Sequence, residues 1–482
     1  MTIESIGVYF ALAFTALIAF WAIWRSTKTT SDDRSYFTAR GMLTQGRLFF
    51  SVFATTFSAF TVVGLPAMFY AHGIWTFVWM GVGIALTPLV LHLIGKRIVN
   101  RAQGSEAGSA IGLISSGYGS RNLMLLLSLV TVIVLFPYLT LQIAGIGKFL
   151  LSTSDGNMSY FAGTAFVCVI VGLYVSTGGA AADAETDYIQ GPILLLGTFT
   201  LGGFLIFEMW GSFADTWKDL QTAGLTTMPG PKGYFTPSTL ISFGVIFTFI
   251  SMSTPQVSQR IMGSTSPKDL NPLIVMYAPI GLTVVALAGL MGLYAATNLD
   301  ISSPDFVAGD VLRSLAGNTS GPFLLIYNLV AVLFITAVIS AAVSTVDSLL
   351  ISIAGIASDN IDEMKPTDSK RKLKVVSWVL LGAGLLFSAN PPTFIVDLAQ
   401  IQLAGLTALL PCLLGPLFGF EKKSSGWLAL FFGLLPILLV QFTDISFAGF
   451  DAGLVGLILG ILGLLLGTMF PEKSITTKSS SI

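Results

Sequence analysis

Long apolar runs recur along this chain from Ile6 to Met469, and no long polar segment separates them. A helix needs about 20 apolar residues to cross the hydrocarbon core of a bilayer. By that measure the sequence predicts about thirteen membrane spans. They cover approximately residues 6–24, 48–71, 75–98, 123–151, 160–176, 186–210, 237–258, 273–297, 323–358, 375–389, 394–418, 426–441 and 448–469.

The small number of charged residues supports a membrane protein. Only 10% of the 482 residues are charged and 54% are hydrophobic, whereas about 25% of the residues in a soluble domain are charged. We therefore expect one all-α, polytopic membrane domain over residues 1–482, with the lipid bilayer and a small-molecule substrate as partners. The net charge of −1 gives no sign of a nucleic-acid partner, and no motif indicates a nucleotide site or an enzyme.

Lysine and arginine positions predict the orientation, because loops on the cytoplasmic side carry an excess of both. With the N-terminus outside, 20 of the 24 basic residues fall on the cytoplasmic side. The four on the outer side are Lys148, Lys218, Lys232 and Arg313. We expect a multi-pass protein of the cell (inner or plasma) membrane, with a cytoplasmic tail at residues 471–482.

Two predicted spans contain a proline that interrupts the helix. The second span carries Gly64-Leu65-Pro66 and the seventh carries Thr254-Pro255. Proline removes an amide donor and clashes with the preceding turn. A broken helix is tolerated in lipid only where protein or a water-filled cavity satisfies the freed backbone. Each proline therefore indicates either a binding site or a simple kink in a packed helix.

One face of the ninth span is lined by small and hydroxyl-bearing residues. Ala341, Ser344, Thr345 and Ser348 are spaced at i, i+3, i+4 and i+7, so they share a helical face. Small residues allow close helix packing, and hydroxyl and carbonyl oxygens also suit a hard monovalent cation. The pattern leaves both interpretations open.

The predicted depths bring this face opposite the second span. Ala54 and Phe57 lie roughly 9 to 14 Å inside the cytoplasmic boundary, at about 1.5 Å per residue. Ser344 and Thr345 lie roughly 8 to 14 Å from the same boundary. If irregular backbone extends from Pro66 down to Ala54, the two segments can form a cation cage.

Acidic residues in or beside the membrane are functional candidates, because burying them is costly. Asp187 opens the sixth span, where it either complements the helix dipole or has a functional role. Asp183 and Glu185 are interpreted as solvated loop residues. Asp347 follows the hydroxyl pair, and we favour an inner-end residue that reaches water over a second cation ligand.

The fourth span carries polar and aromatic residues deep in its apolar run. Tyr138 and Gln142 belong to the segment Phe136–Gln142. They either contact a substrate or form hydrogen bonds to a neighbouring helix. His72 and His92 are isolated in the sequence, so we expect packing histidines rather than a metal site.

Four segments together resemble the sodium/solute symporter family, whose members import proline, pantothenate, monocarboxylates, sialic acid or sugars. The segments are Gly64–Pro66 with Tyr70 and Gly73, Gly178-Gly179 through Asp187 and Gln190, Pro255 through Gln259-Arg260, and Ser344 through Ser348. The resemblance implies two inverted five-helix repeats of the leucine-transporter type, formed by spans 2–6 (residues 48–210) and 7–11 (residues 237–418). One helix would precede them and two (residues 426–469) would follow.

The resemblance also implies which residues bind the coupling ion, Na⁺. The ligands would be the carbonyls of Ala54, Phe57 and Ala341 and the hydroxyls of Ser344 and Thr345. A second group would contribute to another sodium site or to the exit path of the ion; it consists of Asp187, Asp347 and Ser348. The number of ions therefore stays open between one and two.

The substrate site that the resemblance implies is formed by Thr56, Phe60, Tyr138, Gln142, Phe247 and Ser251. Two of these, Phe247 and Ser251, occupy positions that are both aromatic in proline carriers. The segment Phe136–Gln142 is similar to that of relatives handling monocarboxylates or amino acids, so we expect such a solute.

The expected mechanism is alternating access, in which one repeat moves against the other around a site near the bilayer midplane. The sodium gradient and the membrane potential would drive uptake. Two alternatives remain from the residues themselves. One is proton coupling on the same scaffold, with Asp187 or Asp347 titrating, and the other is a membrane domain that senses a solute.

Overall fold

The computed structural model describes residues 2–29, 35–360, 366–389 and 395–471, and every main element among them is a helix. The cytoplasmic tail predicted at 471–482 lies outside these residues except for Pro471. The long and medium helices are α1 (Ile3–Thr29), α3 (Gln45–Thr56), α4 (Leu65–His72), α5 (Trp75–Val90), α8 (Arg121–Thr153), α9 (Tyr160–Met209), α10 (Phe213–Thr222), α11 (Pro237–Ser253), α12 (Pro255–Met262), α13 (Asn271–Asn298), α14 (Val307–Asn318), α15 (Pro322–Asp359), α16 (Pro366–Ala389), α17 (Ile395–Leu414), α18 (Lys423–Phe442) and α19 (Ala452–Gly467). Short connecting helices are α2 (Ser35–Thr38), α6 (Lys96–Ala102) and α7 (Ala110–Ser115).

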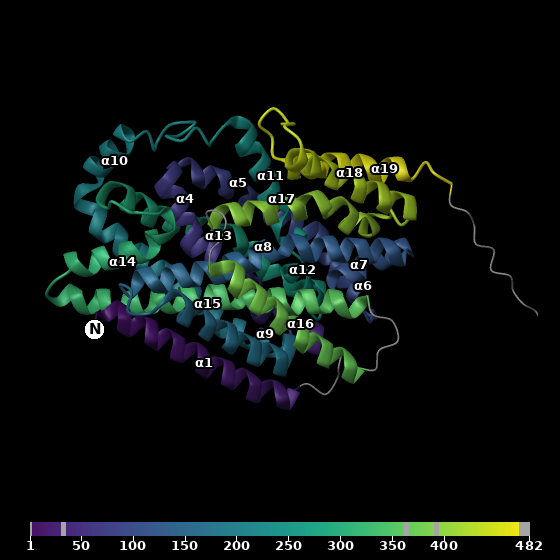
Figure 1. Cartoon of the computed structure of the whole chain (residues 1–482), viewed down its shortest axis with the longest axis horizontal. Coiled ribbons are helices and arrows are strands. Elements are labelled where there is room, and N and C mark those ends of the chain that lie inside the picture. Colours follow the sequence, from purple (N-terminus) through teal and green to yellow (C-terminus); the bar gives the residue numbers. More distant parts are fainter. Residues whose placement is uncertain (1, 30–34, 361–365, 390–394, 472–482) are drawn as a thin grey trace, which may run out of the picture.

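The helices run side by side along the long axis of the molecule (Figure 1). The N-terminus, α10 and α14 lie at one end, whereas α6 and α7 lie at the other. α15 forms the centre: 83% of its most apolar window is buried, against 33% for the peripheral α18. α9 and α1 pack along α15, so the hydroxyl-bearing stretch of α15 lies inside the bundle.

Eight helices in the described part of the chain are long and apolar enough to cross a membrane. The number rises to ten when two bent pairs each count as one span. These pairs are the predicted interrupted spans, α3 with α4, and α11 with α12. α16 (from Lys374) and α19 are shorter apolar helices.

The loop predicted between the fifth and sixth spans is wrong, because residues 177–185 are helical within α9 except at Gly179. A sharp bend at Gly179 divides α9 instead, with φ 56° and ψ −148°. Such a positive φ is strained for a residue with a Cβ but open to glycine. The bend directs the helical residues that follow it into the bundle, so Asp183 and Glu185 are buried rather than solvated.

The interruption of the second span comes earlier in the chain than the predicted Gly64–Pro66. The helical pattern stops at Phe57 and Ser58, then resumes with a π-helical turn at Phe60–Gly64 and continues into α4. The two halves are bent by 51°. Pro66 is in the first turn of α4, where proline is tolerated because an amide there has no helical partner. The break in the seventh span is at Thr254, as predicted, with a bend of 44°.

A glycine allows α5 to approach α11 closely, before the break at Thr254. A Cβ built on Gly83 of α5 would lie 2.3 Å from the Cβ of Phe247 on α11 and 2.6 Å from its carbonyl carbon. No side chain fits in that space unless one helix moves.

We expect Gly83→Ala to destabilise the protein by about 1–3 kcal/mol, because overpacking forces the two backbones apart. The melting temperature of the detergent-solubilised protein measures the effect. Gly203→Ala on α9 is the matched control, since a Cβ there meets no atom within 4 Å. Equal melting temperatures for the two variants would contradict the close approach.

Candidate ion and substrate site

The end of α3 meets the hydroxyl face of α15 at the centre of the bundle. The Thr345 hydroxyl donates to the main-chain carbonyls of Thr55 (3.3 Å) and Ala341 (3.0 Å). The hydroxyls of Thr55 and Ser348 lie 3.1 Å apart. The two segments that the depth argument brought to one level are therefore in direct contact.

Main-chain oxygens gather at this contact because α3 ends there. A helix leaves the carbonyls of its last turn without partners in the helix, and Ala54 belongs to that turn. Phe57 follows with non-helical dihedral angles, φ −90° and ψ 83°. Ala54, Phe57 and Ala341 are all fully buried, so water does not reach these residues freely.

Ser344 faces a carboxylate in this structure. Its hydroxyl donates to Asp187 Oδ1 at 2.5 Å, and Ser51 donates to Asp187 Oδ2 at 2.6 Å. Asp187 is fully buried. It thus lies inside the bundle rather than at the solvated start of a helix.

Tyr138 and Gln142 of α8 support the break. The Ala59 amide donates to the Gln142 side-chain oxygen at 3.0 Å, while the Gln142 amide donates to the Ser58 hydroxyl at 3.3 Å. The Tyr138 hydroxyl donates to the same Ser58 hydroxyl at 2.9 Å. Of the two interpretations of this pair, the hydrogen bond to a neighbouring helix is the one present here.

The remaining residues predicted to contact substrate lie around an aromatic cluster beside the break. The ring of Trp79 lies 6.4 Å from that of Phe60 and 4.8 Å from that of Phe247. Ser251, one turn after Phe247, is buried, and its hydroxyl has no hydrogen-bond partner among the described residues. Thr56 ends α3 and is half-buried. Trp79 was not predicted, because nothing in the sequence separates it from nearby Trp75.

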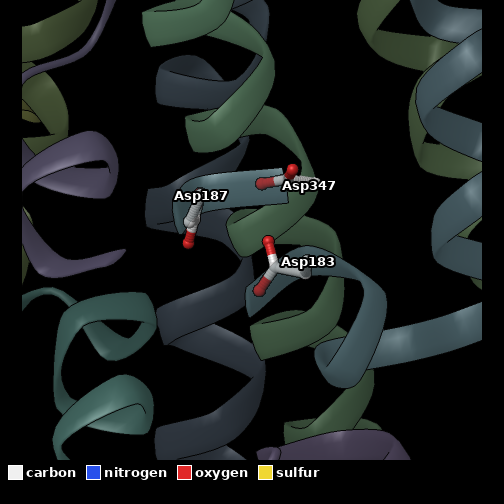
Figure 2. Close-up of side chains that lie close together, drawn as sticks. All are labelled: Asp183, Asp187 and Asp347. Carbon is white, nitrogen blue, oxygen red and sulfur yellow. The ribbon is translucent and has the colours of Figure 1, made fainter. Parts of the chain in front are cut away.

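Three buried aspartates converge beside this contact. Asp183 and Asp187 come from α9 and Asp347 from α15, and their carboxylates point toward one another (Figure 2). One carboxylate oxygen from each lies within 4.8 Å of the others. All three residues are fully buried, so the repulsion between like charges needs local compensation.

Arg260 of α12 supplies a positive charge to this cluster. Its guanidinium forms a two-pronged ion pair with Asp183, at 2.7 and 2.8 Å, and lies 2.7 Å from Asp187. It also donates to the hydroxyls of Thr55 at 2.7 Å and Ser348 at 2.5 Å. Arg260 is only 5% exposed. It therefore links α12 to α9, α3 and α15 from within the bundle.

The predictions for Asp183, Glu185 and Asp347 are corrected by this arrangement, since all three residues are buried. Asp347 does not reach water: the Tyr174 hydroxyl and the Ser348 amide donate to it. Glu185 is not a solvated loop residue, since it lies 3.1 Å from both Arg25 and Arg47. Asp183 and Glu185 are buried because the bend in α9 directs them inward, whereas Asp347 lies on the buried stretch of α15.

Arg260 was counted as an ordinary cytoplasmic charge, and its role in the site was missed. A signal was present, because three acidic residues fall in or beside predicted spans. Buried acids need a counter-charge, and Arg260 follows the proline break by five residues.

We expect Arg260→Met to destabilise the protein by about 3–5 kcal/mol, because it leaves buried carboxylates uncompensated. Adding Asp183→Asn removes one of these charges and should recover part of the loss. Melting temperatures measure both effects, with Lys268→Gln as the control at an exposed basic residue. The ion-pair network would be refuted if Arg260→Met melted like that control, or if Asp183→Asn lowered stability further.

Comparisons with known proteins agree on one family. The model of the sodium:solute symporter family matches residues 36–418. The chain is 28% identical over 416 residues to the sodium/pantothenate symporter of Haemophilus influenzae, which covers 83% of this chain and 82% of the relative. It is 24% identical to the osmoregulated proline transporter OpuE of Bacillus subtilis, over 89% of this chain and 86% of the relative.

Solved structures share the fold. A Na⁺-coupled sialic acid symporter in a substrate-bound outward-open state superposes with a TM-score of 0.76 at 20% identity, over 98% of both chains. MhsT in complex with L-phenylalanine superposes with a TM-score of 0.54 at 15% identity, over 88% of this chain and 97% of that one. The family match, which covers most of the chain, and the leucine-transporter-like fold agree. The chain therefore belongs to the sodium:solute symporter family, whose coupling ion is Na⁺, and is a transporter of a small solute rather than an enzyme.

Proposed function

We propose that this protein uses inward sodium movement to take up a small organic solute that carries a carboxylate, an amino acid or a monocarboxylate. The contact between the end of α3 and the hydroxyl face of α15 is the main support for the proposed ion site. The aromatic cluster beside the same break carries the substrate site.

The proposed sodium ligands are the carbonyls of Ala54, Phe57 and Ala341 and the hydroxyls of Ser344 and Thr345. Oxygen ligands suit a hard cation because they replace its hydration shell. Support comes from the Thr345 hydroxyl, which already lies between carbonyls of α3 and α15. Ser344 is turned toward Asp187 in this structure, and sodium binding would draw its oxygen to the ion.

The proposed topology explains why the ion can control the conformation. Dividing α9 at Gly179 and adding α16 and α19 to the ten spans brings the number to thirteen. Spans 2–6 and 7–11 then form two inverted repeats, which the bent pairs α3–α4 and α11–α12 begin. An ion held by α3 and α15 ties one repeat to the other, so its release frees them to move.

The charged cluster lies on the path from the ion toward α6 and α7, the end that we assign to the cytoplasm. Asp187, Asp347 and Ser348 are proposed to receive the ion as it leaves. Arg260 already contacts Asp187 and Ser348, which supports an exit path and one transported sodium. A second sodium at these residues would have to displace the guanidinium.

A carboxylate fits the proposed substrate site for electrostatic reasons. The half-helix that begins at Phe60 points its N-terminal, positive end toward the break, and such ends favour anionic groups. The two relatives described above are named for pantothenate and proline, solutes that both carry a carboxylate. Phe60, Trp79 and Phe247 would contact the apolar part of the solute, and Ser251 offers a free hydroxyl.

We expect sodium to raise the melting temperature of the purified protein relative to potassium, and Ser344→Ala or Thr345→Ala to abolish this difference. Sodium at ten times its dissociation constant stabilises by about 1.4 kcal/mol. Ser352→Ala is the matched control, because this buried serine of α15 lies two turns away and its hydroxyl has no partner among the described residues. An unchanged sodium effect in both site variants would refute the ligand set. Repeating the measurement at several fixed pH values separates sodium coupling from proton coupling.

We expect a carboxylate to stabilise the protein further when sodium is present, because ion and solute bind to one conformation. The test is a melting-temperature screen of pantothenate, proline and pyruvate, with pantothenol and glucose as controls without a carboxylate. Uptake of the stabilising solute into proteoliposomes should follow an imposed sodium gradient and stop when the gradient collapses. Binding without uptake would favour the solute-sensing alternative, and stabilisation by pantothenol equal to that by pantothenate would refute the carboxylate requirement.

A further inference from the structure

A polar cavity of about 450 Å³ opens beside the outer ends of α4 and α8. Its lining includes His72 at the end of α4, Lys148 of α8 and Lys232 of the segment before α11. Ser303 and Asp305, from the segment before α14, complete the polar part. In Figure 1 this end of the molecule is the one with α10 and α14, which the proposed orientation places outside the cell.

The cavity collects positive charge on a face that has little of it. The sequence predicts four basic residues on the outer side, and two of them, Lys148 and Lys232, line this cavity. Lys148 forms an ion pair with the buried Asp305. Lys232 is exposed and forms no ion pair with any residue that the structure describes. The charges of Lys148 and Asp305 compensate each other, so the positive charge of Lys232 is left in the cavity.

Contacts between rings lead from the cavity to the substrate site. The ring of His72 lies 4.7 Å from that of Tyr234, and Tyr234 lies 6.4 Å from Trp79. Gln400 of α17 donates to the Tyr234 hydroxyl at 2.9 Å. Tyr234 therefore lies between His72 at the cavity and Trp79 in the aromatic cluster. A solute that entered from the cavity would have to displace this ring.

We propose that this cavity is a first binding site for the incoming solute. Lys232 and Lys148 bind the carboxylate there before the ring of Tyr234 is displaced. The proposal rests on the carboxylate substrate and the outward orientation proposed above. It assigns Lys148 a second role, because an arriving carboxylate competes with Asp305 for its ammonium group. That exchange would weaken the ion pair that connects α8 to the segment before α14 as the solute enters.

The test measures the charge of the cavity without depending on transport. A cysteine introduced by Ser303→Cys is labelled in intact cells with membrane-impermeant methanethiosulfonates, one carrying a sulfonate and one a trimethylammonium group. The native Cys168 and Cys412 are both buried, so the new thiol is the accessible one. A single charge nearby changes each rate about threefold in water, so adding Lys232→Gln should lower the anion-to-cation rate ratio about tenfold. Lys218→Gln, at an exposed lysine of α10 away from the cavity, should leave the ratio unchanged.

Protection experiments test binding in the same variant. Pantothenate or pyruvate at millimolar concentration should slow the labelling, whereas pantothenol should not. Protection by pantothenol equal to that by pantothenate, no protection by any carboxylate, or the same rate ratio in the Lys232→Gln and Lys218→Gln variants would overturn the proposal. Labelling in inside-out vesicles but not in intact cells would overturn the orientation.

A transport measurement gives a second readout in a chain with its native serine. Lys232→Gln should raise the KM for the carboxylate about threefold and act on KM rather than on the maximal rate. High salt screens a charge of this kind, so it should raise the wild-type KM toward that of the variant. If sodium-driven uptake is absent but the labelling ratio responds to Lys232, the proposed function fails and the charged cavity stands. If uptake is sodium-driven but Lys232→Gln changes neither KM nor labelling, the cavity proposal alone fails.

Discussion

The backbone leaves the regular helix between α3 and the π-helical turn, inside the bundle. In a bilayer, backbone groups outside a regular helix must find partners in the protein. Gln142 accepts from the Ala59 amide, Tyr138 and Gln142 both bond to Ser58, and Thr345 bonds to the Thr55 carbonyl. These contacts hold the break open toward α15. They support the end of α3, where the carbonyls of the last turn have no partners within the helix.

The buried charges connect this break to α12, the second half of the other bent pair. Removing carboxylates from water is costly, and a fork of donors from Arg260 compensates Asp183 and Asp187 at once. The same guanidinium reaches Thr55 at the end of α3 and Ser348 on α15. A movement of α12 would therefore disturb both helices that form the proposed sodium site. One side chain thus connects the second broken span to both of these helices.

Much of this architecture could be predicted from hydrophobic runs and from the spacing of a few residues. The hydroxyl face of α15 follows directly from helical periodicity, and the two broken spans follow from their prolines. The exact place of the first break could not be predicted, because α4 tolerates Pro66 in its first turn, while the side chain of Gln142 accepts from the Ala59 amide just after the break. Local sequence does not carry that information.

The charged network was the hardest part to predict. Asp183 and Glu185 follow a glycine pair, which is typical of a loop, yet a single positive φ at Gly179 lets the chain bend and continue as helix. That one dihedral angle turns both acids inward. Partners such as Arg260 and Tyr174 come from distant segments, so only tertiary structure brings them to Asp183 and Asp347.

The most direct measurement is an experimental density map of the protein purified in sodium, compared with one in potassium. We expect a spherical density in the sodium map alone. It should lie within ligand distance of the Thr345 and Ser344 hydroxyls and the carbonyls of Ala54, Phe57 and Ala341. A continuous regular helix through Phe57, or a sodium-specific density elsewhere with none at this contact, would contradict it.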